Sequence, residues 1–223
     1  MNLKELAEEL GLSQTTVSRA LNGYPEVAEK TRRRVRAAAE QHNYRPTARD
    51  HCLATGRTMA IGHVIPMTTR YEMINPVFGD FLSGAGETYA QAGYDMILRL
   101  VEDGDQARVY RELKAKGSVD GLILHGPRVK DARIALLHEL GMPFVVHGRA
   151  TEENTPYAWL DVKNRSACRQ ATEHLLDLGH RRTALLNGQE DMDFAARRRA
   201  GFEEALAARG LTADPAFMCS EEM

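Results

Sequence analysis

Apolar residues in the first 22 positions recur every three or four residues, a spacing that predicts two short amphipathic helices. Asn2 followed by Glu5 predicts a capping box at the start of the first helix, which extends to Leu10. Gly11 predicts the left-handed turn that ends this helix, and Ser13 is a favourable N-cap for the second. The chain is therefore expected to begin with two helices separated by a tight turn.

The outward face of the second helix carries side chains suited to DNA. Its members are Gln14, Thr15, Thr16, Ser18, Arg19 and Asn22. Glutamine and threonine can contact base edges, arginine can contact guanine or a phosphate, and serine can contact a phosphate. The two helices predict a helix-turn-helix unit whose second helix enters the major groove. The alternative is a helical hairpin whose polar face meets only solvent, because such patterns also occur in other proteins.

The first 57 residues resemble the headpiece of the LacI/GalR family of bacterial repressors through TTVSRALNG, VAEKTRRRVRAAAEQHNYRPTA and LATGRT. The resemblance implies that Thr15 and Thr16 face the major groove, with Arg19 on the same helix and Gln14 beside them. It also implies a set of residues that contact phosphates or brace the headpiece. This set is Ser18, Asn22, Thr31 and Tyr44. Repression, rather than activation, is an implication of the resemblance alone.

A short hinge is expected after the headpiece, at residues 46–57. In the family this segment forms a helix on the operator, and a leucine matched by Leu53 wedges into the minor groove and kinks the DNA. Here Asp50 and His51 stand where the family usually has small or basic residues. A carboxylate facing phosphates is unfavourable, which predicts a weakened hinge. Protonation of His51 below about pH 6.5 would partly offset that effect.

Charge is divided unevenly along the chain. Through Arg57 there are ten Lys and Arg against seven Asp and Glu, so the other residues carry 19 against 24 of the totals of 29 and 31. The basic N-terminal part is where DNA is expected to bind. The run of arginines within it fits either a phosphate patch or a solvated helix face. This run is Arg32, Arg33, Arg34 and Arg36.

Composition and motifs narrow the function classes. The 223 residues, 43% of them hydrophobic, suffice for one good domain plus a small one. No apolar run of about 18 residues and no leader occurs, so we expect a cytoplasmic protein without a membrane partner, associated with the bacterial nucleoid. Cys52, Cys168 and Cys219 lack metal-ligand spacing, which argues against a structural zinc. Neither a P-loop nor a GxSxG elbow occurs, so neither an enzyme nor a cofactor is predicted.

From Met59 onwards short apolar runs alternate with amphipathic helical patterns. The runs predicted as buried strands are MAIGHVI, YDMILRLV, GLILHG, PFVVHG and TALLNG. The patterns predicted as helices span 77–92, 106–116, 131–140, 165–178 and 194–209. This alternation predicts a doubly wound α/β core with parallel sheets and helices on both faces. Ligands of such sheets bind at the carboxyl ends of the strands.

This part of the chain resembles the family's effector-binding core, a periplasmic-binding-protein-like fold of two subdomains. The matching segments are IGHVIP, NPVFGDFLSGAGE, ATEHLLDLGHRRTALLNG and RRRAGFEEAL. The resemblance implies an all-α headpiece at 1–45, the hinge at 46–57, a first core subdomain at 58–157 and a second at 158–223. Family members continue well beyond the position matched by Met223, so we expect the second subdomain to be incomplete, with an unpaired sheet edge.

Candidate effector-binding residues come from two sources. The residues that match the family's pocket are Phe78, Met192, Phe194 and Arg198. A planar guanidinium can hold vicinal hydroxyls or a carboxylate, which suits the arginine to this role. Independently of the family, His125, His147 and Arg149 follow strands, where an open sheet presents its ligand face. The alternative for each histidine is a structural hydrogen bond in a loop.

The residues around Gly148 bear on the chemical type of the effector. The family often has an acidic residue near Gly148 that binds sugar hydroxyls, and this chain does not. Histidine with arginine therefore leads to the hypothesis of a sugar phosphate or a more acidic ligand. The leading function is a homodimeric repressor that binds a pseudo-palindromic operator under the control of a carbohydrate-like effector. The alternatives are a DNA-binding remnant without an effector response and a stand-alone sugar-binding protein.

Overall fold

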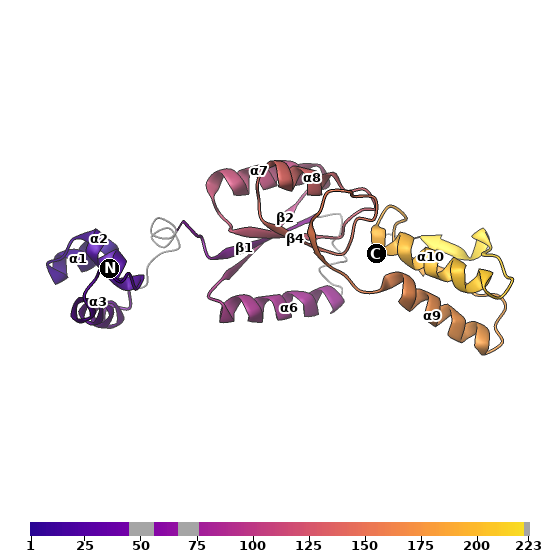
Figure 1. Cartoon of the computed structure of the whole chain (residues 1–223), viewed down its shortest axis with the longest axis horizontal. Helices are drawn as coiled ribbons and strands as arrows, with labels where there is room; N and C mark the ends of the chain where they lie inside the picture. Colours follow the sequence, from indigo (N-terminus) through magenta and orange to yellow (C-terminus); the bar gives the residue numbers. More distant parts are fainter. Residues whose placement is uncertain (45–55, 67–75, 221–223) are drawn as a thin grey trace. The chain divides into compact units, whose positions relative to one another are not determined.

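The computed structural model describes residues 1–44, 56–66 and 76–220. The chain forms two compact units (Figure 1). The first contains Met1–Met59 with Gly117–Asp120, and the second contains Ala60–Lys116 with Gly121–Met223. An all-α headpiece and an α/β core are therefore present, as the sequence predicts. Among the described residues, no helix combines the length and the apolar character needed to cross a membrane.

The headpiece is built from α1 (Leu3–Leu10), α2 (Gln14–Leu21) and α3 (Glu29–Gln41). Every helix contributes fully buried side chains to its core, among them Leu6, Val17 and Val35. The predicted capping box is confirmed, because Glu5 N donates to Asn2 Oδ1 at 3.0 Å and Asn2 N donates to Glu5 Oε2 at 2.9 Å. At the other end of α1, Gly11 has a φ of 60°, the left-handed conformation that glycine adopts without strain.

The core contains a parallel five-stranded sheet in the order β2-β1-β3-β4-β5. Its strands are β1 (Ala60–Pro66), β2 (Asp95–Val101), β3 (Gly121–His125), β4 (Phe144–His147) and β5 (Ala158–Leu160). The first four coincide with predicted apolar runs. The sequence did not predict β5, which pairs with β4 through Val146 and Trp159. The sheet therefore continues past residue 157, where the sequence places the subdomain boundary.

Helices cover both faces of this sheet, as the alternating pattern predicts. Figure 1 shows α6 (Pro76–Gln91) on one face and α7 (Gln106–Lys116) with α8 (Ala132–Glu139) on the other. The apolar side chains from α7 and α8 are deeply buried, and Tyr110, Ile134 and Leu137 are at most 1% exposed. The core is therefore well packed on the α7 and α8 side. The α6 face carries polar groups, which are described below.

The remaining elements form a second, smaller layer. They are α9 (Asn164–Asp177), β6 (Leu185–Asn187), α10 (Asp193–Ala207) and β7 (Met218–Ser220), with the 3₁₀ turn η3 (Pro215–Phe217) before β7. Another 3₁₀ turn, η2 (Asp103–Asp105), joins β2 to α7. Strands β6 and β7 pair in parallel. Leu176 of α9 and Phe202 of α10 are buried in one cluster. A glycine, Gly201, lets the backbones of these two helices approach closely.

Hydrogen bonds to the carboxylate of Asp120 hold the chain where it enters the core. Asp120, which precedes β3, accepts hydrogen bonds from Thr58 N at 2.7 Å and from Met59 N at 3.0 Å. The Thr58 hydroxyl donates to the same carboxylate at 2.9 Å. These bonds fix the first residues after the predicted hinge, and they occur where Met59 has a positive φ of 54°.

Candidate functional sites

The predicted DNA-contacting face lies on α2. Ser13 caps this helix by accepting a hydrogen bond from Thr16 N at 3.1 Å, and its hydroxyl lies 2.8 Å from the hydroxyl of Thr16. The hydroxyl of Thr16 is therefore engaged with the cap. Gln14, Thr15 and Arg19 are exposed. Their donors and acceptors are available to a partner, which is the requirement for contact with base edges.

The residues expected to contact phosphates or brace the headpiece differ in their burial and contacts. Asn22 Nδ2 donates to Ser18 O at 2.9 Å, so this pair also ends α2. Thr31 is half-buried on α3. Tyr44 is buried in the headpiece core, which favours bracing over phosphate contact. Leu53, with the hinge positions Asp50 and His51, lies outside the described residues.

Arginines of α3 bind other parts of the headpiece. Arg34 Nη2 donates to Leu10 O at 2.6 Å, and Arg32 Nη1 donates to Gly23 O at 3.3 Å. These two carbonyls lie at the ends of α1 and α2, where helix carbonyls lack partners within the helix. Arg32 and Arg33 also pair with Glu29. Of the two alternatives for this arginine run, the contacts favour a structural and solvated face over a free phosphate patch.

Three histidines form a row on the α6 face of the sheet: His63 on β1, His125 on β3 and His147 on β4. His125 and His147 are directly paired in the register of β3 and β4, and His63 pairs with Ile123, two residues before His125. His63 Nδ1 and His125 Nε2 are hydrogen-bonded at 2.8 Å, and His125 Nδ1 and His147 Nδ1 at 3.2 Å. At the opposite end, His63 Nε2 bonds the Tyr89 hydroxyl of α6 at 3.2 Å.

Aromatic rings of α6 cover this histidine row. The Phe81 ring lies nearly parallel to the His147 ring with centroids 4.2 Å apart, and the Phe78 and His125 rings are nearly perpendicular with centroids 5.1 Å apart. Phe78 was expected to line the effector pocket, and it is buried against the row. Sequence reasoning found His125 and His147 but missed His63 and Phe81. The available signal for His63 was a polar residue inside the apolar run MAIGHVI.

The histidine row is uncharged at neutral pH. Burial, helped by the nearby His147, lowers the pKa of His63 from 6.5 to about 4. Burial, with the neighbouring His63, His147 and Arg133, lowers the pKa of His125 to about 2. Burial also lowers the pKa of His147, although the carboxylate of Asp161 opposes that shift. The row therefore offers neutral donors and acceptors. The described residues contain no cluster of His, Cys, Asp and Glu arranged to hold a metal ion.

A second group of candidate residues lies at the start of α10. Arg198 Nε donates to Asn164 Oδ1 at 3.0 Å, and its guanidinium lies 4.8 Å from the centre of the Phe194 ring. These contacts hold the guanidinium plane in one orientation, which suits it to bind a ligand through its free nitrogens. Met192 is the N-cap residue of α10 and is half-buried. Three of the four residues that match the family pocket thus lie within two turns of one helix.

Asp161 connects this group with the histidine row. It follows β5 directly and accepts a hydrogen bond from Arg197 Nη1 at 2.7 Å, while its charge also acts on His147. Arg149, after β4, places its guanidinium 4.2 Å over the ring of Trp159 on β5. Asp161 and Trp159 lie at the carboxyl ends of parallel strands, where such sheets bind ligands. Sequence reasoning missed both because it did not recognise β5.

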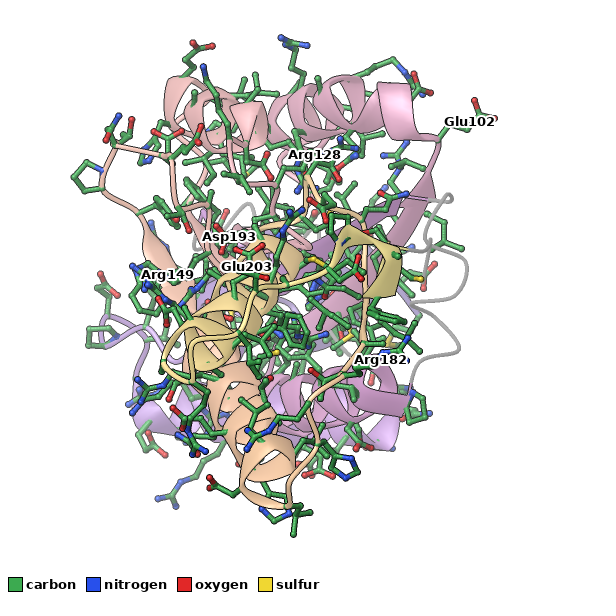
Figure 2. The ribbon with its side chains drawn as sticks, turned by 90° about the vertical axis from the view of Figure 1, so that its right-hand side faces the viewer. Glu102, Arg128, Arg149, Arg182, Asp193 and Glu203 are labelled. Carbon is green, nitrogen blue, oxygen red and sulfur yellow. The ribbon has the colours of Figure 1, made fainter. Side chains whose placement is uncertain are left out.

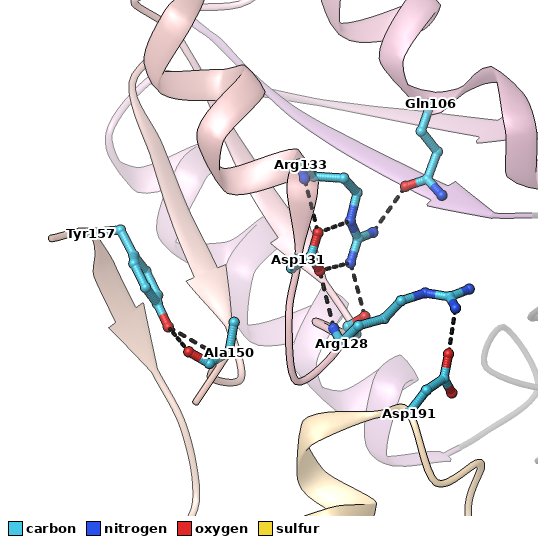
Figure 3. A network of polar contacts seen from close by, with 8 residues as sticks. Gln106, Arg128, Asp131, Arg133, Ala150, Tyr157 and Asp191 are labelled. Carbon is cyan, nitrogen blue, oxygen red and sulfur yellow. Dashed lines mark hydrogen bonds and ion pairs between the residues drawn. The ribbon is translucent and has the colours of Figure 1, made fainter. Parts of the chain in front are cut away.

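A buried ion pair shapes the loop after β3. Asp131 and Arg133 are joined by several hydrogen bonds, and Arg133 also donates to Gln106 Oε1 at 2.9 Å (Figure 3). Burial alone would raise the pKa of Asp131, but the hydrogen bonds and charge of Arg133 lower it overall. From the same loop Arg128 pairs with Asp191 ahead of α10. This network positions the strand ends next to the candidate site.

The start of α10 is held by the same loops. Asp193 N donates to Pro127 O at 3.1 Å, and its carboxylate accepts from Thr151 N at 2.8 Å. Figure 2 labels Asp193 with Arg128 and Arg149, which follow β3 and β4 respectively. The loops after β3 and β4 are therefore tied to the helix that carries Phe194 and Arg198. These contacts are structural, and they hold the two groups of candidate residues in fixed positions.

Two family models match the chain. The model for periplasmic binding proteins and the sugar binding domain of the LacI family matches residues 58–222. The model for bacterial regulatory proteins of the lacI family matches residues 2–47. The HTH-type transcriptional regulator AglR of Rhizobium meliloti (strain 1021) is 44% identical over 98% of this chain. That match covers 61% of AglR, so the chain spans about three fifths of the length of this curated relative.

Solved structures agree with this relationship. A transcriptional regulator CelR–cellobiose complex is similar over the whole chain, with a TM-score of 0.67, 27% identity and 66% of that chain covered. The lac repressor dimer bound to operator and the anti-inducer ONPF is similar over the whole chain, with a TM-score of 0.81 and 25% identity over 66% of its length. The match of both models, one to the headpiece and one to the core, shows that this chain belongs to the LacI family of bacterial regulatory proteins.

Proposed function

We propose that this protein is a DNA-binding transcriptional repressor that acts in the bacterial cytoplasm, at the nucleoid, and catalyses no reaction. The proposal is carried by the exposed polar face of α2, where Gln14, Thr15 and Arg19 lie on a stable headpiece. A homodimer would place two such helices in successive major grooves of a pseudo-palindromic operator. The similarity to the lac repressor dimer on its operator supports this arrangement.

A salt-controlled anisotropy titration against a pool of random palindromic duplexes tests this function. We expect enrichment of one pseudo-palindrome with a central pyrimidine–purine step. Leu53 matches the family leucine that inserts into the minor groove, and such a step is the easiest to kink. Weak and unselective binding that falls steeply with salt would contradict a sequence-specific regulator. It would instead indicate a headpiece that contacts only the phosphate backbone.

Arg19→Ala is expected to weaken binding to the selected duplex by about 1–3 kcal/mol, because arginine can form a bidentate contact with guanine. The loss should be smaller on duplexes altered at the contacted base. Arg33→Ala is the matched control, since the Arg33 side chain is 80% exposed on α3. The control should leave the sequence preference unchanged. A loss for Arg19→Ala that is uniform over all duplexes would make Arg19 a phosphate contact.

We propose that the effector is a neutral carbohydrate bound near the histidine row and Arg198. Uncharged imidazoles can exchange hydrogen bonds with hydroxyls but do not attract a phosphate, and the rings of Phe81 and Trp159 offer apolar surface to a sugar. This choice replaces the acidic ligand that the sequence suggested. The similarity to a regulator in complex with cellobiose supports it.

Isothermal titration with cellobiose, other neutral oligosaccharides and phosphorylated sugars tests the effector class. Arg198→Ala should weaken binding of a neutral sugar by roughly 1.5–3 kcal/mol, the usual contribution of a hydrogen bond to a charged group. The control is Arg165→Ala, whose side chain is 58% exposed on α9. Tight binding of phosphorylated sugars alone would overturn the neutral class. An unchanged affinity in Arg198→Ala would mean that the sugar does not contact Arg198, and no binding of any sugar would favour a DNA-binding remnant without an effector response.

A further inference from the structure

The histidine row and Tyr89 form a continuous line of hydrogen bonds, and all bonds of the line must be donated in the same direction. A neutral imidazole has one N–H and one acceptor nitrogen, so each histidine in the middle of the line must donate on one side and accept on the other. Tyr89, His63, His125 and His147 are joined at 3.2, 2.8 and 3.2 Å. His63 and His125 are 0% and 3% exposed. Water therefore has little access to the two inner imidazoles.

Only two arrangements of protons satisfy every bond in the line. In the first, the Tyr89 hydroxyl donates to His63 Nε2, His63 and His125 carry their protons on Nδ1, and His147 accepts at Nδ1. Its own proton is then on Nε2. In the second, His147 carries its proton on Nδ1, His63 and His125 carry theirs on Nε2, and Tyr89 accepts. Mixed arrangements leave two N–H groups or two lone pairs facing each other, which is costly in a buried site.

We infer that His63 and Tyr89 are positioning residues that set, through His125, whether His147 presents a donor or an acceptor to the effector. His147 is half-buried, and among the described residues its Nε2 has no hydrogen-bond partner. In the first arrangement this atom is a donor, and in the second it is an acceptor. The groups that face the row from neighbouring elements are Arg133 near His125 and Asp161 near His147.

This inference links the site to α6. A ligand atom that only accepts hydrogen bonds, such as a ring or glycosidic oxygen, selects the first arrangement at His147. A ligand that only donates there selects the second. Either choice is transmitted without any change of fold to the hydroxyl of Tyr89, which lies on the helix that covers the row. The role in ligand recognition rests on the proposed effector site, whereas the directed line itself does not.

The test is long-range ¹H–¹⁵N NMR of the 223-residue chain labelled with ¹⁵N-histidine, recorded at pH 7 without ligand or DNA. The shifts of the two ring nitrogens identify each tautomer. We expect His63 and His125 to share one tautomer and His147 to have the opposite one. If the two arrangements exchange rapidly, all three residues should report the same ratio of the first arrangement to the second. Opposite tautomers at His63 and His125, or a cationic imidazole in the row, would overturn the inference. Because no effector is present, this outcome is independent of the proposed function.

Coupling along the line is tested by Tyr89→Phe. Without the hydroxyl, the second arrangement leaves a buried N–H of His63 without an acceptor, whereas the first leaves only a lone pair unfilled. Unpaired buried N–H groups are the rarer of the two, so the His147 tautomer ratio should move several-fold towards the Nε2–H form. The matched control is Tyr94→Phe, which should leave the ratio unchanged. No shift at His147 in Tyr89→Phe would show that the residues are not coupled.

A second variant separates transmission along the row from a general loosening of the core. Glutamine at position 63 can turn either its oxygen or its NH₂ group towards His125, so His63→Gln removes the directional constraint. In the His63→Gln background, adding Tyr89→Phe should no longer change the His147 ratio. A shift of the same size in both backgrounds would mean that Tyr89 acts on His147 by another route, and it would remove His63 from the inferred role.

Discussion

Gly201→Ala should separate α9 from α10 and destabilise the core by about 3 kcal/mol or more, which is at the upper end of the usual cost of overpacking. A Cβ atom at position 201 would overlap Arg165 O and lie 3.0 Å from Arg169 N. Both are backbone atoms of α9, so neither can rotate away as a long side chain would. The two helices would have to move apart, and this would disturb the contact of Phe202 with the apolar cluster beneath.

Gly84→Ala is the matched control, because Gly84 is also helical but a Cβ there would meet no atom within 4 Å. Alanine is favoured over glycine in a helix, so the control should be neutral or stabilising by about 0.5–1 kcal/mol. Amide hydrogen exchange followed by mass spectrometry measures the effect peptide by peptide. Protection in α9 and α10 should collapse in Gly201→Ala and persist in Gly84→Ala. Equal protection in both variants would mean that the two helices do not need this close approach.

Local signals in the sequence predicted most elements of the fold. The capping box of Asn2 with Glu5, the glycine at position 11 and the Ser13 cap are interactions within a few residues, and all three are present. The helix predicted at 106–116 has the observed bounds of α7. The long apolar runs also form strands, as predicted. Burial was wrong for β2, where Leu98 and Leu100 are 39% and 50% exposed. Elements stabilised by their own sequence were therefore predictable.

Strands that depend on a distant partner were not. The segment of β5 is three residues long and exposed, with Trp159 at 47% and Leu160 at 64% exposure, so it has no buried pattern. Its extended conformation comes from pairing with β4, which no local rule can anticipate. Strand β7, from Met218 to Ser220, has the same dependence on β6. Missing β5 also hid Asp161, which follows that strand directly.

The candidate site followed the same division. His125 and His147 were identified because they stand at the ends of apolar runs, where a parallel sheet presents ligands. His63 stands inside such a run and joins them only through the register of β1 against β3. His125 does make structural hydrogen bonds, but it lies on β3 and its partners are two other histidines. Register across strands decides such clusters, and it is a property of the folded sheet.

Acidification from pH 6.5 to 4.5 should destabilise the core through the buried histidines. Burial lowers the pKa of His63 from 6.5 to about 4 and that of His125 to about 2. In the unfolded chain both imidazoles take up a proton near pH 6.5, so below that pH the unfolded chain binds more protons than the folded one. The free energy of unfolding is therefore highest above pH 6.5 and falls with pH, by up to about 1.4 kcal/mol per pH unit for each imidazole.

Urea unfolding followed by the fluorescence of Trp159, the single tryptophan of the chain, measures this dependence on β5 of the same sheet. The buried Asp131 contributes little in this window, because its pKa is lowered from 3.8 and so lies below the window in both the folded and the unfolded chain. His63→Gln removes one of the buried imidazoles, so it should flatten the slope by up to about 1.4 kcal/mol per pH unit, whereas the exposed His174→Gln should not. A wild-type stability that stays constant from pH 6.5 to 4.5 would mean that the row accepts protons in the folded state. The neutral line of imidazoles requires the opposite, because burial disfavours the charge that a protonated His125 would carry.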